Sequence, residues 1–303
     1  SGTRAAQCPR RNRKPLAIGW FCYFLARCLP HDRQSKLIVK TALIPGTDIS
    51  TSRLSFGTAS LHHLLRSNQR QSLLGSVVDA GFTHLDTSPY YGYGLAEEAI
   101  GLLIKNGSSE LTIASKIGLY PPTGSSANSA QVVVRKLVGR VLPTVALPTQ
   151  DWSLKRAQTS LDKTLRRIHR DYLDILYLHE PVYGCLDEGE FVAWLERQKE
   201  LGKIRCWGLA GDSNRFGQWL DQEHPLGKLL QVKRSLDDAE LAPAVAARPN
   251  QFSYGYLSSA KNVHKNADVL QTLSTALRKN PEGSIIVSTR NPLRIAQLTE
   301  VAM

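Results

Sequence analysis

The chain has 303 residues and a mass of 33.5 kDa, with 42% hydrophobic and 21% charged residues. This balance is typical of globular proteins and excludes disordered and fibrous chains, and no apolar run approaches the roughly 18 residues that a membrane-spanning helix needs. The net charge of +12 could indicate an anionic partner. However, residues 1–36 hold eight basic side chains and one acidic one, against 30 and 25 in residues 37–303.

The first 36 residues differ from the rest of the chain. A basic stretch at 10–14 precedes an apolar run at 16–26, an order typical of signal peptides, but no cleavage site of small residues follows. We expect residues 1–36 to be a basic, disordered extension, or an artefact of a fragmentary sequence that starts at Ser1 and has its only methionine at 303. A membrane-surface anchor, an export signal and anion or nucleic-acid binding are the alternatives.

Cysteine and histidine usage gives no sign of a disulfide framework or a metal site. The five cysteines are irregularly spaced and form no CxxC pair, which favours a reducing compartment, and we expect the cytoplasm. His62 and His63 have no third ligand at metal spacing. We therefore expect no metal.

From residue 37 onward, short apolar segments alternate with helical patterns. Segments 37–44 and 49–54, joined by turn residues 45–48, predict a β-hairpin. Eight strands are predicted after it, at 54–58, 82–86, 111–116, 172–179, 204–210, 229–232, 250–254 and 284–288. This alternation over residues 37–303 predicts a (β/α)8 TIM barrel with an N-terminal β-hairpin. The rival is a doubly wound sheet, but Gly92-x-Gly94 lacks the third glycine of a dinucleotide-binding fingerprint.

Two helices and one long connection stand out between these strands. Apolar residues at steps of three and four predict a helix over 154–168, capped by Asp151, and another over 269–277 that ends at Asn280. Segment 120–150 is long for a connection between a strand and its helix. Because such connections surround the active site of a barrel, we interpret it as a candidate specificity lid.

Three successive predicted strands end in side chains that suit acid–base chemistry. Asp86, Lys116 and His179 stand at the carboxyl ends of these strands, and Tyr91 lies in the loop after Asp86. A free tyrosine has a pKa of about 10, and a nearby lysine ammonium is expected to lower it. Asp86 would neutralise the lysine, and His179 would bind a substrate oxygen. Such a set can protonate an alkoxide as it forms, without a metal or a covalent intermediate.

Four motifs around these residues carry a family resemblance. They are Gly81-Phe-Thr-His-Leu-Asp86-Thr-Ser-Pro-Tyr-Tyr91-Gly92, Ile113-Ala-Ser-Lys116, Asp174-Ile-Leu-Tyr-Leu-His179 and Gly202-Lys-Ile-Arg-Cys-Trp-Gly208. They resemble the aldo-keto reductase superfamily, and the first is most similar to the branch that contains L-galactose and D-threo-aldose dehydrogenases. The resemblance implies a nicotinamide cofactor and a catalytic tetrad. In it, Tyr91 donates or accepts the proton, Lys116 and Asp86 tune Tyr91, and His179 orients the carbonyl.

The resemblance also implies a set of cofactor-binding residues. Tyr254 aligns with the tyrosine that stacks on the nicotinamide ring, and Gln231 with the glutamine that binds its carboxamide. The segment from Ser288 to Arg294 resembles the one that holds the adenosine phosphates. The complete implied set is Gly57, Thr58, Gly211, Gln231, Tyr254, Ser288, Thr289, Arg290 and Arg294.

The sequence departs from the family pattern in places that affect the cofactor. Ala210-Gly211 stands where the family often has Ser-Asn, so one carboxamide hydrogen bond is missing or replaced by another. Ser288 stands where many NADP-dependent members have lysine, although Arg290 and Arg294 could bind a 2′-phosphate. The cofactor is therefore NADP or NAD, with NADP favoured. We also expect the C-terminal segment that often lines the substrate site to be missing.

These observations predict an NAD(P)-dependent oxidoreductase. It would transfer hydride between nicotinamide and a carbonyl carbon or a sugar C1, with Tyr91 as the general acid or base. The expected partner is a small-molecule carbonyl compound or sugar, and no nucleic acid. The alternative is a cofactor-binding regulatory barrel with little turnover, which Gly211 and the N-terminal extension favour slightly.

Overall fold

The structure is a computed structural model that describes residues 2, 39–108, 110–122, 147–263 and 268–303. The chain divides into two units, Ser1–Lys36 and Leu37–Met303. Apart from Gly2, the first unit lies outside the described residues, and so does most of the predicted lid. Within the described ranges, no helix is long and apolar enough to cross a membrane.

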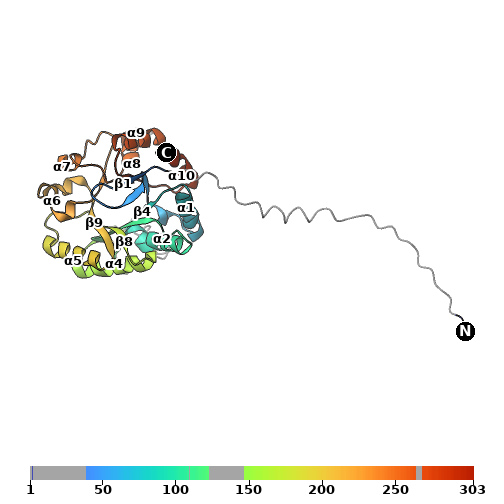
Figure 1. Cartoon of the computed structure of the whole chain (residues 1–303), viewed down its shortest axis with the longest axis horizontal. Coiled ribbons are helices and arrows are strands. Elements are labelled where there is room, and N and C mark those ends of the chain that lie inside the picture. The colour runs from blue at the N-terminus through green and yellow to red at the C-terminus, as the bar shows by residue number, and fades with distance from the viewer. Residues whose placement is uncertain (1, 3–38, 109, 123–146, 264–267) are drawn as a thin grey trace. The chain divides into compact units, whose positions relative to one another are not determined.

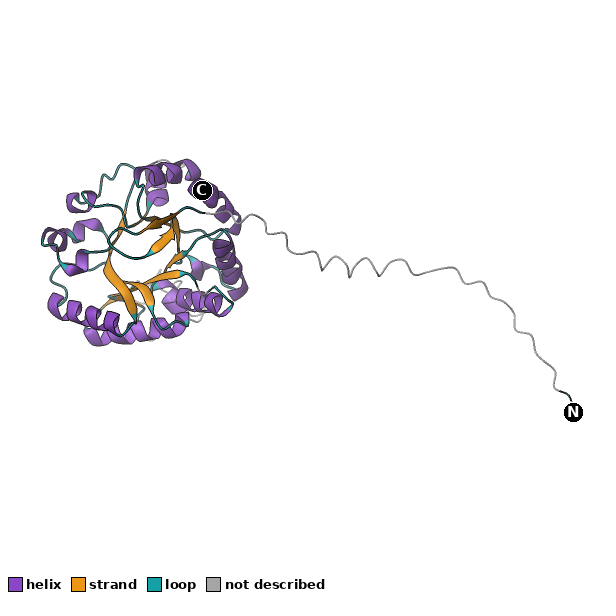
Figure 2. Cartoon of the chain, viewed as in Figure 1, coloured by secondary structure: helices purple, strands orange, loops and turns teal. Residues whose placement is uncertain are grey.

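Eight parallel strands form a closed barrel in the second unit, surrounded by helices (Figures 1 and 2). The ring closes where β12 pairs with β3, with Ile286 opposite Ser55. All eight strands overlap the predicted segments, so the predicted barrel is confirmed and the doubly wound alternative is excluded. The strands are β3 (Leu54–Gly57), β4 (His84–Asp86), β5 (Thr112–Ile117), β8 (Leu173–His179), β9 (Ile204–Gly211), β10 (Leu230–Lys233), β11 (Phe252–Tyr254) and β12 (Ser284–Val287).

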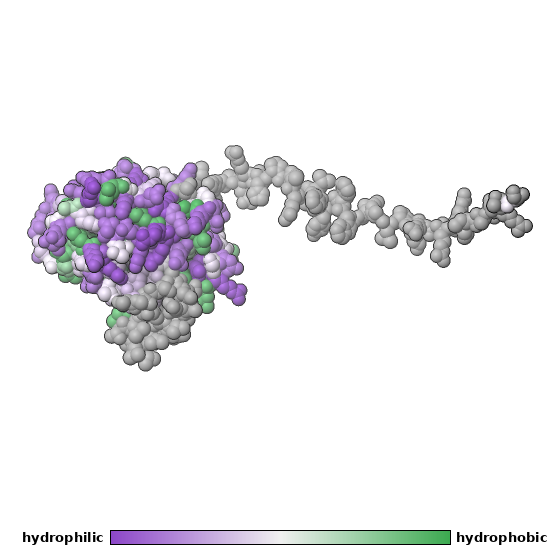
Figure 3. All heavy atoms as spheres, turned by 90° about the horizontal axis from the view of Figure 1, so that it is seen from below, coloured by the Kyte–Doolittle hydropathy of each residue, from purple (hydrophilic) through white to green (hydrophobic). Residues whose placement is uncertain are grey.

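Helices follow the strands and present polar outer faces; the face seen in Figure 3 is mostly hydrophilic, with hydrophobic residues in small groups. The α-helices are α1 (Ser67–Asp79), α2 (Leu95–Lys105), α4 (Leu154–Ile168), α5 (Glu188–Glu200), α6 (Gly217–Asp221), α7 (Pro243–Ala246), α8 (Tyr256–Val263), α9 (Val269–Lys279) and α10 (Pro292–Ala302). Short 3₁₀ turns are η2 (Leu61–His63), η3 (Tyr91–Gly94), η5 (Ser213–Arg215) and η6 (Pro225–Gly227).

Helix α4 spans the predicted residues 154–168, but its capping residue differs from the prediction by two positions. Its N-cap is Ser153, whose hydroxyl accepts the backbone N–H of Arg156 at 3.4 Å. Asp151 instead accepts the N–H of Ser153 at 2.9 Å and fixes the turn before the helix. The predicted cap at Asp151 is therefore wrong, because serine and aspartate are equally good caps and the sequence offered both.

The predicted hairpin is present and closes one end of the barrel. Strands β1 (Thr41–Leu43) and β2 (Ser50–Ser52) pair in antiparallel fashion. Ile44 and Ile49 beside the turn are fully buried and pack in one cluster with barrel residues that include Ile175, Phe252 and Ile286. Since this end is filled, the opposite rim, where the strands end, is the one left to carry a site.

Candidate active site

A cavity of about 400 Å³ lies at the carboxyl ends of the barrel strands. In parallel barrels this is the rim that carries catalytic groups. Nine of the predicted site residues line it, namely Gly57, Asp86, Tyr91, Lys116, His179, Gly211, Gln231, Tyr254 and Ser288. Across the part of the chain that the structure describes, no group of three or more His, Cys, Asp or Glu side chains is placed to hold a metal ion.

The loop after β4 turns sharply enough to bring Tyr91 back over Asp86. The three residues after Tyr91 all have positive φ values: Gly92 at 61°, Tyr93 at 60° and Gly94 at 99°. Glycine adopts this conformation without steric cost. At Gly92 a side chain would also collide with η2, because its Cβ would lie 2.7 Å from the Cβ of His62. The two glycines therefore shape the turn that positions the tyrosine.

Lys116 on β5 links the other groups. Its Nζ donates to Asp86 Oδ1 at 2.5 Å, to the carbonyl of Thr87 at 3.0 Å and to the hydroxyl of Tyr91 at 3.3 Å. The lysine and aspartate side chains are only 2% and 6% exposed. All three ammonium donors are thus used within a dry site. A short chain of contacts leads from a carboxylate through an ammonium to a phenol.

The electrostatics of Tyr91 differ from the sequence-based expectation. Burial raises its pKa well above the ordinary value, and the carboxylates of Asp86 and Glu180 raise it further. The expected lowering by Lys116 is wrong, because Asp86 compensates the ammonium at close range and the phenol is dry. Burial also lowers the pKa of Lys116, against the opposing effect of Asp86. At neutral pH, Tyr91 is therefore a protonated phenol.

His179 at the end of β8 is a neutral imidazole that faces Tyr91. Burial, followed by the charge of Lys116, lowers its pKa well below the ordinary value. Its ring stands edge-on to that of Tyr91, with the centroids 6.2 Å apart. Its Nδ1 is buried and has no hydrogen-bond partner among the described residues. A buried polar atom of this kind is suited to a ligand oxygen.

The predicted cofactor residues fall into two groups. Five of them line the cavity, namely Gly57, Gly211, Gln231, Tyr254 and Ser288. The hydroxyl of Ser288 donates a hydrogen bond to the carbonyl of Gly57 at 2.7 Å, and the side-chain amide of Gln231 donates one to Asp86 Oδ1 at 2.7 Å. Four others do not line it. The hydroxyl of Thr58 is buried and donates to the carbonyl of Asp86, and the remaining three, Thr289, Arg290 and Arg294, lie between β12 and the first turn of α10.

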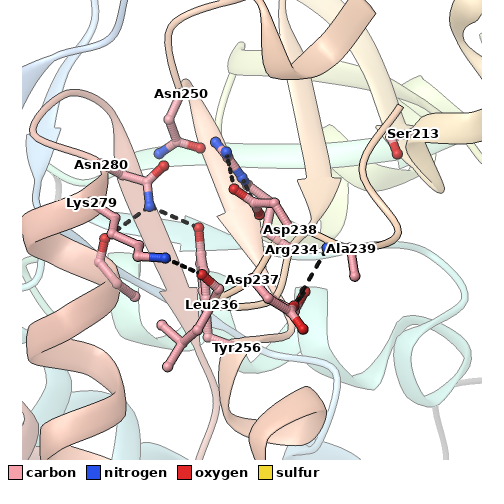
Figure 4. A network of polar contacts seen from close by, with 12 residues as sticks. Ser213, Arg234, Leu236, Asp237, Asp238, Ala239, Asn250, Tyr256, Lys279 and Asn280 are labelled. Atoms are coloured by element: carbon pink, nitrogen blue, oxygen red, sulfur yellow. Dashed lines mark hydrogen bonds and ion pairs between the residues drawn. The ribbon is translucent and has the colours of Figure 1, made fainter. Parts of the chain in front are cut away.

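A polar network braces one wall of the cavity (Figure 4). Tyr256 lines the cavity, and its hydroxyl accepts a hydrogen bond from Asn280 Nδ2 at 3.0 Å. The segment after β10 is held by an ion pair between Arg234 and Asp238 at 2.6 Å, and Lys279 at the end of α9 donates to the carbonyl of Leu236. This wall is therefore fixed to α9 by specific contacts.

Glu180 also stands near the site and was not predicted from the sequence. This residue follows His179 and has a positive φ of 55°, which is unusual for a non-glycine residue. Its carboxylate lies beside Gly211, where a Cβ would approach it to 2.5 Å. The available signal was an acidic residue directly after a strand-end histidine, but the prediction stopped at the last strand residue.

Comparisons with known proteins agree with this architecture. Residues 53–235 match the model of the aldo/keto reductase family. The chain is 26% identical over 181 residues to L-galactose dehydrogenase of Arabidopsis thaliana, a match that covers 57% of this chain and 49% of the relative. It is 26% identical over 169 residues to D-threo-aldose 1-dehydrogenase of a Pseudomonas species, covering 52% and 49%. The chain thus spans about half the length of these curated relatives.

Solved structures show the same fold. A glycerol dehydrogenase from Gluconobacter oxydans superposes with a TM-score of 0.66 at 18% identity, covering 86% of this chain and 89% of that one. An aldo-keto reductase from Klebsiella pneumoniae in complex with NADPH superposes with a TM-score of 0.61 at 20% identity, covering 88% and 90%. The family match extends over more than half of the chain and includes the four predicted catalytic residues, Asp86, Tyr91, Lys116 and His179. The chain belongs to the aldo/keto reductase family.

Proposed function

We propose that the protein is an NAD(P)-dependent oxidoreductase that transfers hydride between a nicotinamide and a carbonyl carbon or a sugar C1. The observation that carries the proposal is the contact chain from Asp86 through Lys116 to Tyr91, with the neutral His179 on the wall of the same cavity. Carbonyl reduction requires a proton donor, a group that stabilises the conjugate base of that donor, and a group that binds the substrate oxygen.

In the reducing direction, Tyr91 supplies the proton. The bound cofactor supplies the hydride that reaches the carbonyl carbon. Tyr91 gives its phenolic proton to the carbonyl oxygen, while His179 holds that oxygen in place. The phenolate left behind is stabilised by the ammonium of Lys116 at 3.3 Å and regains a proton from solvent. In the oxidising direction the phenol first loses its proton to solvent, and the phenolate beside Lys116 then accepts the proton of the alcohol, so the same residues serve both directions.

The residues around the cavity fit a nicotinamide cofactor. Gly57, Gly211 and Gly255 give a wall of backbone without side chains, and Tyr254 offers an aromatic face for the ring. Beyond the cavity, Arg290 and Arg294 flank the N-terminus of α10, where backbone N–H groups and positive charge suit phosphates. This arrangement fits NADP or NAD, and we propose NADP because both arginines are available for a 2′-phosphate.

The substrate class is proposed from the relatives. Two of them are named for the oxidation of an aldose or L-galactose, and another is an NADH-specific methylglyoxal reductase from Escherichia coli. We propose an aldose or another small aldehyde, handled in a reducing compartment such as the cytoplasm, which the few cysteines favour. Reduction of an aldehyde and oxidation of an aldose use one site, so the direction follows the ratio of the cofactor forms.

The experiment that tests the proposal has two stages. Titration calorimetry with NADPH and NADH should show binding of at least one of them, and the bound protein should then oxidise or reduce members of a panel of aldoses and aldehydes. A folded protein that binds neither cofactor form would contradict the proposal. Tight binding with no turnover on any substrate would support a cofactor-binding regulatory barrel instead.

A further inference from the structure

The carboxylate of Glu180 is fixed beside Gly211, where β8 and β9 end. Its Oε2 accepts the backbone N–H of Asp212 at 3.2 Å and lies 3.7 Å from a guanidinium nitrogen of Arg215. The same guanidinium donates to the backbone carbonyl of Glu180 at 3.2 Å. These contacts hold the side chain in a residue whose backbone already has an unusual φ of 55°. The position of the charge is therefore defined by the fold.

This charge lies directly behind a residue of the cavity wall that has no side chain. Gly211 lines the cavity, and a Cβ at that position would lie 2.5 Å from the Glu180 carboxylate. Because glycine has no side chain, residue 211 does not screen the carboxylate from the cavity. The effect reaches two tyrosines on the cavity wall: after burial, Glu180 is the largest cause of the raised pKa of Tyr254, and it also contributes at Tyr91.

The other charges of the cavity leave that of Glu180 in excess. Lys116 and Asp86 neutralise each other at 2.5 Å, while Tyr91 and His179 are uncharged. Arg215 lies 3.7 Å from the carboxylate and offsets part of its charge, and water screens both groups, whose side chains are 43% and 29% exposed. The cavity therefore has a net negative potential on the side of Gly211 and Tyr254.

A nicotinamide ring is positively charged when oxidised and neutral when reduced, and the rest of the cofactor is the same in both forms. We propose that Glu180 makes this site bind the oxidised cofactor in preference to the reduced one. The inference rests on the proposed function, because it places the ring against Tyr254 and Gly211. It assigns to Glu180 a role in positioning charge and gives it no part in proton transfer.

The test compares the dissociation constants of NADP⁺ and NADPH by titration calorimetry at low ionic strength. In Glu180→Gln, which keeps the shape and removes the charge, the ratio Kd(NADP⁺)/Kd(NADPH) should rise about threefold to tenfold, with Kd(NADPH) nearly unchanged. Glu200→Gln removes the same charge from an exposed pair on α5 and should leave the ratio as in the wild type. Arg215→Gln should shift the ratio in the opposite direction, because it leaves Glu180 uncompensated.

Each result decides between distinct conclusions. Equal loss of affinity for both cofactor forms in Glu180→Gln would show a purely structural role and overturn the inference. An unchanged ratio in Arg215→Gln would overturn it independently, even if Glu180→Gln fails to fold. Binding of both forms to the wild type with a ratio insensitive to Glu180 leaves the proposed function standing, whereas binding of neither form defeats both.

Discussion

The buried pair of Asp86 and Lys116 governs the charge state of the other groups at the rim. Burial raises the pKa of Tyr91, and the ammonium, neutralised by Asp86 at 2.5 Å, does not reverse this shift, so the phenol keeps its proton until a substrate oxygen needs it. The pair itself stands in a dry environment, where a charge without its partner costs several kcal/mol. The rim thus depends on both members for stability as well as for chemistry.

Replacing Asp86 by Asn should therefore destabilise the fold by about 3–5 kcal/mol, since it leaves the Lys116 ammonium buried without a counter-ion. The measurement is the free energy of unfolding in urea. The matched control is Glu200→Gln, which breaks the exposed pair with Arg197, whose side chains are 63% and 67% exposed; there we expect a loss below about 1 kcal/mol. Losses of equal size in the two variants would contradict the account of a dry ion pair.

At the scale of elements, the contact between α2 and α4 depends on one glycine. A Cβ on Gly101 in α2 would lie 2.0 Å from the backbone carbonyl oxygen of Arg167 in α4. Gly75 in α1 is also inside a helix, but a Cβ there would meet nothing within 4 Å. Each glycine lowers the helix propensity of its own helix by the same amount. They differ in the space around them, because Gly101 is in close contact with α4 and Gly75 is not.

Gly75→Ala should raise the free energy of unfolding by about 0.5–1 kcal/mol, because alanine loses less backbone entropy in a helix. Gly101→Ala carries the same local gain but must push two backbones apart, so we expect a net loss of at least about 1–3 kcal/mol. Thermal and urea unfolding of both variants measure this difference. Stabilisation by Gly101→Ala would show that α2 and α4 are not packed as described.

The elements were largely predictable because their signals are local. Apolar runs bounded by turn residues mark the eight strands, and the strand-end residues Asp86, Lys116 and His179 follow from the rule that parallel strands end at one rim. What depends on distance in space was not predictable. The raised pKa of Tyr91 reflects burial, the hydroxyl of Thr58 is bound by the carbonyl of Asp86, and Glu180 lies beside Gly211, which is 31 residues away in the chain.

At the scale of the whole molecule, buried histidines make the fold sensitive to acid. His84 is fully buried and packs against the ring of Phe252. Its Nδ1 shares a hydrogen bond of 2.8 Å with the hydroxyl of Thr112. Burial, with a smaller effect of Lys116, lowers its pKa from 6.5 to about 3. Between these values the unfolded chain binds a proton that the folded protein does not. Folding stability is therefore intact above about pH 6.5 and decreases as the pH falls toward 3.

His84 alone should lower the free energy of unfolding by about 1.4 kcal/mol for each pH unit between about pH 6.5 and 3. His84→Gln, which retains a group able to hydrogen-bond Thr112, should reduce the slope of unfolding free energy against pH by that amount between pH 6 and 4. His169→Asn, at the exposed C-cap of α4, serves as the control and should keep the wild-type slope. An identical slope in His84→Gln and the wild type would mean that His84 titrates normally.

The central claim is that Tyr91 supplies the proton for a nicotinamide-dependent reduction. Its most direct test is the single-turnover rate of aldehyde reduction by the NADPH-bound protein, measured in the wild type, in Tyr91→Phe and in the neighbouring control Tyr90→Phe. We expect the rate to fall about 10²–10⁴-fold in Tyr91→Phe alone, with the Kd for NADPH within twofold of the wild type. A Tyr91→Phe variant as active as the wild type would contradict it.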